Sequence, residues 1–321
     1  MRSDGMIGRS DLFCSVKLLI EKMAAYDAPV LIEGETGTGK ELAARAIHYQ
    51  GLRRNRAFVP VNCGALPDQL IENELFGHRR GAFTDARDDQ PGLVALANEG
   101  TLFLDEIDAL TPKGQVTLLR FLQDLQFRPL GGKREEQAEV RIVAASNRSL
   151  EQLTASGQFR LDLLYRLNLM HLTLPPLRER HGDVPLLAEN FISLASARFG
   201  KPARPLSGNS LEWFERYSWP GNIRELENLI YREFLLSEGP EISIALPASL
   251  PPACDAAPAG AMLDHRCAKK RAIEEFESRY LTRLFGNANG NVSAAARLCG
   301  TERRHLGRLL KKYHIVKAPQ G

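Results

Sequence analysis

The sequence predicts an α/β core built on a parallel sheet, a helical region after it, and a small all-α segment at the C-terminal end. Three observations predict this arrangement. Short apolar runs alternate with helix-like segments from Asp27 to about Leu174, a helical pattern continues to about Ser237, and residues 263–321 are strongly basic. The expected parts are residues 1–174 (α/β), 175–238 (helical), 239–262 (linker) and 263–321 (C-terminal).

The composition limits the class of protein. Of the 321 residues 44% are hydrophobic, which is enough for one large core and a small second domain. The chain has no apolar run of the roughly 18 residues that a membrane-spanning helix needs, and its polar start, MRSDG, does not resemble a signal peptide. We therefore expect a cytoplasmic protein with no membrane partner. The five cysteines lack C-x-x-C spacing, which argues against a disulfide framework or a zinc site.

The strands of the core are expected at four short apolar runs. Such runs are typical of strands buried on both faces, as in a parallel sheet that is covered by helices. The runs are 29–32 (PVLI), 58–61 (FVPV), 101–104 (TLFL) and 140–144 (VRIVA).

A glycine-rich loop follows the first of these runs and precedes a helical segment from Glu41 to His48. Its sequence, GETGTGK, has the G-x-x-x-x-G-K spacing in the strand-to-helix context that binds phosphate. Backbone N–H groups, the helix N-terminus and the lysine ammonium all attract the phosphates of ATP. In the generic motif Ser or Thr follows the lysine, whereas here Glu41 does. The residues expected to bind ATP are Gly34, Glu35, Thr36, Gly37, Thr38, Gly39, Lys40 and Glu41.

Two carboxylates, Asp105 and Glu106, follow the third apolar run. Asp105 is expected to hold Mg²⁺ through water, and Glu106 to polarise the water that attacks the γ-phosphate. An acidic strand end is ordinary by itself. Downstream of a phosphate loop, this pair predicts an ATP hydrolase.

After the α/β part, helices are expected at Pro185 to Phe199 and at Asn222 to Leu236, and the Pro- and Ala-rich stretch 239–262 is expected to be a linker. Residues 263–321 then hold 13 Lys or Arg against 5 Asp or Glu, leaving 29 against 34 elsewhere. Their pattern of helix, Gly300 turn and helix predicts binding to double-stranded DNA. The alternative is a small basic bundle that docks on the core. The basic residues expected to contact DNA are Arg303, Arg304, Arg308 and Lys311.

Five motifs, in the order GETGTGKE, ELFGHRRGAFTDA, GTLFLDEI, LPPLRER and WPGNIRELEN, closely resemble the sigma-54-dependent activators, the bacterial enhancer-binding proteins of the AAA+ class. The resemblance covers nearly the whole chain. It implies an AAA+ P-loop NTPase core, an α-helical lid and a Fis-type helix-turn-helix domain at the C-terminal end. An acidic residue commonly follows the lysine in that family, so Glu41 fits it.

The resemblance also implies roles for five polar residues. Asn62 would hold the catalytic glutamate inactive, Asn147 would sense the γ-phosphate, and Arg224 would sense nucleotide from the lid. Arg160 and Arg166 would be arginine fingers that reach the nucleotide of a neighbouring subunit. The alternatives are a strand-end cap, an ordinary turn and, for the two arginines, surface salt bridges.

The sequence GAFTDA is similar to the GAFTGA loop by which that family contacts sigma-54. Phe83 is expected to touch the sigma factor with support from Thr84, and the alternative is a buried phenylalanine in a turn. Asp85 stands where the family usually has glycine, so it restricts the backbone and adds a negative charge. The expected contact residues are Gly81, Ala82, Phe83, Thr84, Asp85 and Ala86.

The sequence features predict an ATP hydrolase that binds DNA. The resemblance further implies a transcription activator that binds upstream DNA as dimers, forms a hexameric ring and uses ATP to open promoter complexes of sigma-54 RNA polymerase. Two alternatives stay open: a DNA-binding AAA+ regulator that does not engage sigma-54 because of Asp85, and an AAA+ remodeller of another protein. The ATPase part begins almost at Met1. Control is therefore expected from another protein or from expression level, or the chain is part of a longer one.

Overall fold

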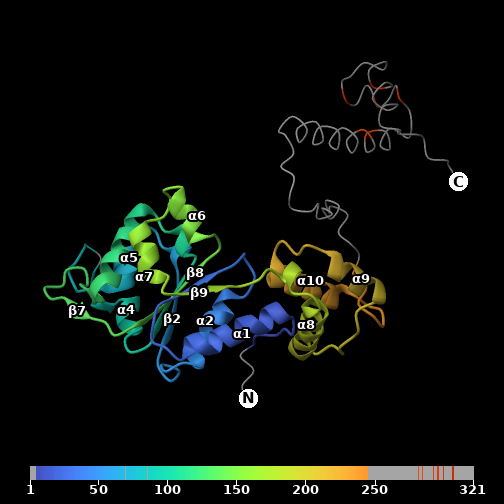
Figure 1. The fold of residues 1–321 in the computed structure, drawn as a ribbon, viewed down its shortest axis with the longest axis horizontal. Coiled ribbons are helices and arrows are strands. Elements are labelled where there is room, and N and C mark those ends of the chain that lie inside the picture. Colours follow the sequence, from blue (N-terminus) through green and yellow to red (C-terminus); the bar gives the residue numbers. More distant parts are fainter. Residues whose placement is uncertain are drawn as a thin grey trace. The chain divides into compact units, whose positions relative to one another are not determined.

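The computed structural model describes residues 5–68, 70–84 and 86–244, together with residues 281, 284, 292, 295, 299 and 306. The chain divides into two compact units, residues 1–253 and 254–321, and the first contains a sheet and its covering helices (Figure 1). Most of the predicted linker and the predicted helix-turn-helix lie outside the described residues. So do the four residues expected to contact DNA, Arg303, Arg304, Arg308 and Lys311.

A five-stranded sheet forms the centre of the first unit, in the order β2-β5-β8-β1-β9, and all neighbouring strands are parallel. Its middle strands, β5, β8 and β1, are almost wholly buried, as the apolar runs predict. Parallel strands end at one edge, and there Asn62 lies opposite Asp105. The strands are β1 Val30–Glu33, β2 Phe58–Asn62, β5 Thr101–Asp105, β8 Arg141–Ser146 and β9 Met170–Thr173.

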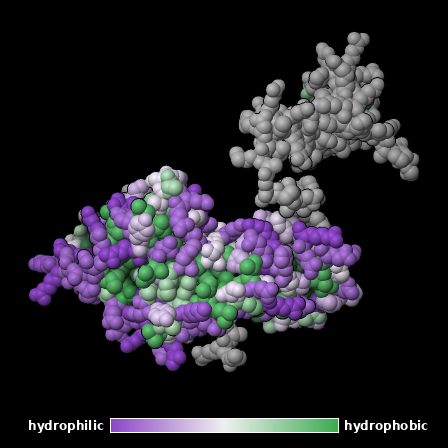
Figure 2. All heavy atoms as spheres, viewed as in Figure 1, coloured by the Kyte–Doolittle hydropathy of each residue, from purple (hydrophilic) through white to green (hydrophobic). Residues whose placement is uncertain are grey.

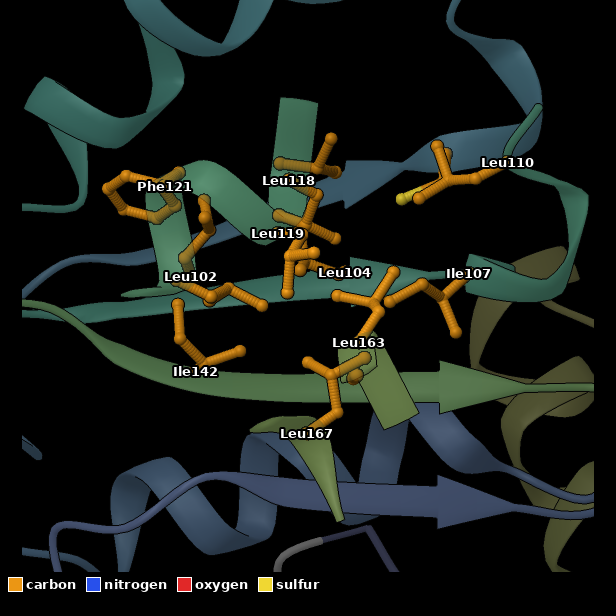
Figure 3. Close-up of a cluster of buried hydrophobic side chains, with 14 of the residues drawn as sticks. Leu102, Leu104, Ile107, Leu110, Leu118, Leu119, Phe121, Ile142, Leu163 and Leu167 are labelled. Carbon is orange, nitrogen blue, oxygen red and sulfur yellow. The ribbon is translucent and has the colours of Figure 1, made fainter. Parts of the chain in front are cut away.

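Helices cover both faces of the sheet (Figure 1). On one face Leu118 of α5 and Leu163 of α7 pack over Leu104 of β5, and all three are almost fully buried (Figure 3). On the other face Ile20 of α1 and Ile47 of α2 pack in a second core. Helix α1 is not among the predicted elements. The helices of this part are α1 Asp11–Ala24, α2 Lys40–Tyr49, α3 Ile71–Phe76, α4 Leu93–Leu96, α5 Pro112–Asp124, α6 Leu150–Ala155 and α7 Leu161–Leu167, with short 3-10 turns η1 Cys63–Ala65 and η2 Ile107–Ala109.

Two small hairpins project from the α/β part. The first pairs β3 with β4 and encloses the GAFTDA sequence; the second pairs β6 with β7. Their strands are β3 Gly77–His78, β4 Gln90–Pro91, β6 Gln126–Phe127 and β7 Glu136–Gln137.

Three helices, which we call the lid, follow β9 and a 3-10 turn, η3. They pack around Trp219, Phe214 and Phe234, all of which are fully buried. The helix predicted from Asn222 to Leu236 has those bounds, and the one predicted from Pro185 begins two residues earlier. The elements are η3 Leu177–Glu179, α8 Asp183–Phe199, α9 Gly208–Arg216 and α10 Asn222–Leu236.

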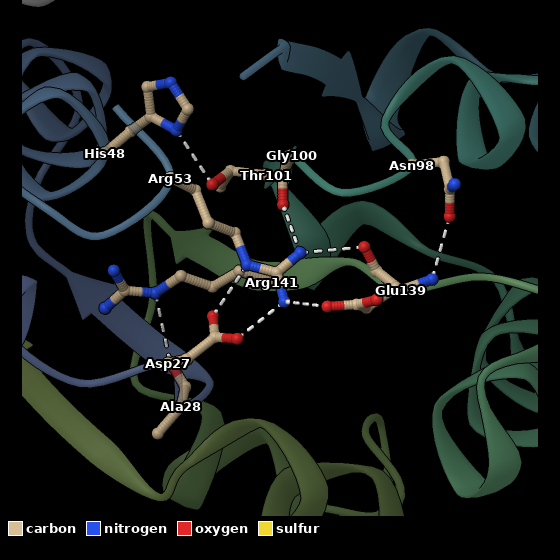
Figure 4. Close-up of polar contacts among 9 residues, drawn as sticks. All are labelled: Asp27, Ala28, His48, Arg53, Asn98, Gly100, Thr101, Glu139 and Arg141. Atoms are coloured by element: carbon tan, nitrogen blue, oxygen red, sulfur yellow. Dashed lines mark hydrogen bonds and ion pairs between the residues drawn. The ribbon is translucent and has the colours of Figure 1, made fainter. Parts of the chain in front are cut away.

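The amino ends of the strands are held by a polar network (Figure 4). The Arg53 guanidinium donates to the Asp27 carboxylate and to the carbonyl oxygens of Gly100 and Glu139. Arg141, which is buried, donates to the carbonyl oxygens of Ala28 and Met23. These contacts join the segments that lead into three strands. The amino ends of the strands therefore have a structural role, and the polar side chains at their carboxyl ends are available for catalysis and binding.

The surface of the described part is largely hydrophilic on the face shown in Figure 2, with hydrophobic patches among charged side chains. One group of exposed apolar residues lies on and just after α7, where Leu161 is 51%, Tyr165 73% and Leu169 69% exposed. Within the described part of the chain, no helix is long and apolar enough to cross a membrane.

Candidate nucleotide site

The predicted phosphate loop runs from the end of β1 into α2. Gly37 and Gly39 adopt φ values of +81° and +98°, which glycine tolerates and residues with a Cβ atom rarely adopt. The Thr38 hydroxyl donates to the carbonyl oxygen of Glu35 at 2.8 Å, which closes the turn. A loop of this kind at a helix N-terminus binds phosphate through its N–H groups.

Lys40 opens α2 and is only 7% exposed. Its ammonium donates to the carbonyl oxygens of Gly34 and Glu35, at 2.7 and 3.0 Å, and to Oδ1 of Asn147 at 2.6 Å. Burial lowers the pKa of Lys40, and nearby carboxylates oppose this shift. Those carboxylates belong to Asp105, Asp108 and Glu106. The edge of the sheet thus holds one buried cation among acids, a setting in which phosphate and a divalent cation can bind together.

The two predicted carboxylates lie at the end of β5. Burial raises the pKa of the Asp105 carboxyl, although the Glu106 N–H donates to its Oδ1 at 2.9 Å. Glu106 itself has a left-handed φ of +54°. A Cβ atom added to Gly64 would lie 2.8 Å from Oε2 of Glu106 and 3.3 Å from Oδ1 of Asn62. The Glu106 carboxylate and the Asn62 amide therefore flank Gly64, a residue that sequence reasoning missed.

Two asparagines at strand ends have different contacts. Asn147 accepts from the Lys40 ammonium, and its own N–H donates to the Asp108 carboxylate at 3.2 Å. Asn62 Oδ1 accepts from the N–H of Ala65 at 3.1 Å, so its hydrogen bond is the strand-end cap of the alternative interpretation. Asp108, which the sequence analysis did not select, therefore fixes the position of Asn147.

The lid contacts the phosphate loop directly. The Arg178 guanidinium donates twice to the Glu35 carboxylate, at 2.7 and 2.9 Å, and the Asn222 amide donates to the same carboxylate at 3.1 Å. A Cβ atom on Gly37 would lie 3.2 Å from Cβ of Arg224, so the predicted lid arginine begins beside the loop. Its charge also lowers the pKa of Lys40.

Residues 81–84 and 86 of the GAFTDA sequence lie in the turn region between β3 and β4. Phe83 is 43% exposed, and its ring meets the edge of the His78 ring at a centroid distance of 4.9 Å. This exposure contradicts the alternative of a buried phenylalanine. Ala82 packs on Gly131, which lies between β6 and β7, because a Cβ atom there would be 2.9 Å from Cβ of Ala82. Asp85 lies outside the described residues.

Two protein families match the chain. The family described as "Sigma-54 interaction domain" matches residues 6–173, which is more than half of the chain, and the one described as "AAA+ ATPase lid domain" matches residues 178–261. The chain belongs to the sigma-54 interaction domain family. Its α/β part and lid therefore form an AAA+ ATPase, and the predicted family, parallel-sheet core and helical lid are confirmed.

Transcriptional regulators are among the similar proteins. The chain is 44% identical over 308 residues to the hydrogenase transcriptional regulatory protein HoxA of Bradyrhizobium diazoefficiens, which covers 94% of this chain and 62% of HoxA. It is 42% identical to the response regulator protein PilR of Pseudomonas aeruginosa, covering 97% of this chain and 70% of PilR. The chain thus spans a little under two thirds of HoxA.

The chain is also similar to a solved structure. NtrX from Brucella abortus in complex with ADP has a TM-score of 0.73 and 32% identity, over 98% of this chain and 70% of that one. The ATP complex of NtrX matches equally, with a TM-score of 0.72 and 31% identity.

The two arginines expected to be fingers in this AAA+ domain lie on α7 or just before it. The Arg160 guanidinium pairs with Asp162 at 2.7 Å on the surface, as the salt-bridge alternative predicts. Arg166 lines a pocket of about 530 Å³ with Arg53 and Arg141. No described contact joins either arginine to the phosphate loop of its own chain.

Proposed function

We propose that the chain hydrolyses ATP to drive activation of sigma-54 RNA polymerase. The observation that carries this proposal is that one compact unit combines an assembled nucleotide site with an exposed Phe83 on a projecting turn. An exposed aromatic between small residues fits contact with a second protein. The family match and the resemblance to the nucleotide complexes of NtrX support the same assignment.

In this proposal the phosphate loop and Lys40 bind the β and γ phosphates, and Arg224 approaches them from the lid. Glu106 accepts a proton from the attacking water. Asn62, which lies on the other side of Gly64, would hold the Glu106 carboxylate in an inactive position when the site is idle. Magnesium, when bound with the nucleotide, neutralises phosphate charge. Within the described part no group of three His, Cys, Asp or Glu forms a metal site, and magnesium in such enzymes usually takes one or two carboxylates plus phosphate oxygens. Asp105 is the carboxylate that fits this role.

Hydrolysis in this scheme requires a ring. Leu161, Tyr165 and Leu169 form an exposed apolar group beside Arg160 and Arg166, which supports self-association there. Each subunit would then supply its two arginines to the nucleotide of its neighbour, as a hexamer would allow. The basic residues of the C-terminal part would hold dimers on upstream DNA.

The test is a trapped complex. Purified chain is mixed with sigma-54 and an ADP–aluminium fluoride transition-state mimic, and complexes are resolved on a native gel. We expect a stable complex that Phe83→Ala abolishes without abolishing ATP hydrolysis. A complex formed only by Asp85→Gly would mean that this chain is instead a DNA-binding AAA+ regulator without a sigma-54 contact. The comparisons give no support to that second function.

A further inference from the structure

One buried amide joins three parts of the AAA+ domain. Asn222, the first residue of α10, is 0% exposed. Its Nδ2 donates to the carbonyl oxygen of Thr36 at 3.0 Å and to Oε2 of Glu35 at 3.1 Å. Its Oδ1 accepts from the N–H of Leu177 at 2.8 Å. Both amide protons and the amide oxygen are thus used, and each bond leaves α10 for another segment.

The backbone around Asn222 is as closely fitted as its side chain. Asn222 has a left-handed φ of +51°, a conformation that asparagine tolerates better than most residues. The next N–H, that of Ile223, donates to the carbonyl oxygen of Gly37 at 3.0 Å. A Cβ atom on Gly37 would lie 2.4 Å from the carbonyl oxygen of Gly221. The start of α10 and the phosphate loop therefore touch backbone to backbone.

The Glu35 carboxylate extends this contact toward the surface. Its hydrogen bonds from Arg178, which outweigh the opposing effect of burial, hold the pKa of Glu35 below its usual range. The carboxylate consequently stays ionised at neutral pH and accepts from η3 and α10 together.

We infer that Asn222 is a positioning residue that couples the orientation of the lid to the conformation of the phosphate loop. Arg224 lies two residues further along α10, so a rotation of this helix moves the Asn222 amide and Arg224 together. Such a rotation would separate the buried Asn222 amide from the Thr36 carbonyl oxygen, and a buried polar group without a partner is costly. This inference rests on the proposed nucleotide site, and it adds the connection by which that site and the lid sense each other.

The decisive variant is Asn222→Gly. Glycine keeps the left-handed backbone and removes the amide, whereas Ala would add backbone strain. The affinities for a fluorescent ATP analogue and for ADP are measured together with kcat and KM. Loss of two hydrogen bonds to the loop should weaken ATP binding about tenfold. Arg224→Ala should then cost much less in the Asn222→Gly background than in the wild-type chain, because its position depends on Asn222.

Additive effects of Asn222→Gly and Arg224→Ala, or unchanged ATP affinity in Asn222→Gly, would overturn the inference. Glu35→Gln provides a second variant, because this half-exposed side chain can change without disturbing the core; it should weaken ATP binding in the same direction. Ser210→Ala is the control: Ser210 is a buried polar residue of the lid whose hydroxyl bonds to Ile244 rather than to the loop, so ATP affinity should not change. A wild-type chain that bound no nucleotide would instead refute the proposed site itself, as comparison with Lys40→Ala would show.

Discussion

Two interfaces within the described unit, which we call the lid seam and the loop seam, are built from different kinds of contact. At the lid seam, the buried Asp183 carboxylate accepts from the N–H groups of Arg9 and Ser10 and from the Arg180 guanidinium, and Arg180 is itself 1% exposed. At the loop seam, between the β3–β4 turn and the β6–β7 hairpin, Arg79 pairs with Asp89 at 2.9 Å and with Glu136 at 2.8 Å. These three side chains are 41–53% exposed.

The difference in exposure implies a difference in rigidity. Breaking a buried ion pair leaves a charge without solvent or partner, whereas exposed pairs are replaced by water and screened by salt. The lid seam therefore anchors the start of the lid firmly to the segment that carries Arg9 and Ser10. The loop seam should allow the turn that carries Phe83 to move at small cost, as the proposed contact with sigma-54 requires.

The largest expected effect is at the lid seam. Asp183→Asn leaves the buried Arg180 without its counter-charge, and it should lower the free energy of unfolding by about 3–5 kcal/mol. Urea unfolding followed by circular dichroism measures this loss. Asp89→Asn removes a carboxylate from the loop seam and should leave the urea midpoint where it is. Equal losses in the two variants would show that the seams do not differ.

A glycine at the nucleotide site tests whether close packing also serves catalysis. Gly64→Ala places a methyl carbon 2.8 Å from Oε2 of Glu106, so this carboxylate must shift, and kcat should fall about 100-fold with ATP affinity largely kept. Gly208→Ala is the matched control, since a Cβ atom there meets nothing within 4 Å. Steady-state hydrolysis and nucleotide binding separate the two effects. Normal turnover in Gly64→Ala would argue against Glu106 as the catalytic base.

A weaker effect is expected at the loop seam. Arg79→Ala removes both exposed ion pairs and should raise the rate of chymotrypsin cleavage at Phe83 several-fold, with ATP binding unchanged. Added salt should raise the cleavage rate of the wild-type chain in the same way. Arg128→Ala, which breaks an exposed pair with Glu135 within one hairpin, provides the comparison and should cleave as the wild type does. A cleavage rate that changed neither in Arg79→Ala nor with added salt would mean that the packing of Ala82 alone holds the turn.

The sequence predicts the elements of the domain better than the contacts between them. The phosphate loop and the helix from Asn222 to Leu236 follow from glycine spacing and helical periodicity, which are local properties of the chain. The role of Asn222 depends on its left-handed backbone and on a carbonyl oxygen nearly two hundred residues earlier, so no local pattern carries it. Gly64 is similar, because its importance lies in the Glu106 oxygen that occupies the space beside it.

The smallest expected effect lies outside both seams. It measures how much a partly exposed ion pair contributes to the free energy of unfolding. Nε2 of His171 on β9 lies 3.3 Å from the Glu33 carboxylate on β1. This hydrogen bond raises the pKa of His171 and outweighs the opposing effect of burial. The folded chain therefore binds this proton more tightly than the unfolded chain does. The resulting stability is fully present below the unfolded pKa and is lost as the pH rises through the folded pKa.

Urea unfolding of the wild-type chain and of His171→Gln, from about pH 5.5 to 8.5, tests this sign. Because the imidazole is 37% exposed, solvent screening should keep the difference below about 1 kcal/mol at low pH, and the difference should shrink toward high pH. The Glu33 carboxyl has a lowered pKa, because hydrogen bonds from His171 and Leu150 outweigh the opposing effect of burial, so its contribution is lost only as the solution becomes acidic. A difference that grew with pH would mean that the neutral imidazole, rather than the ion pair, stabilises this edge of the sheet.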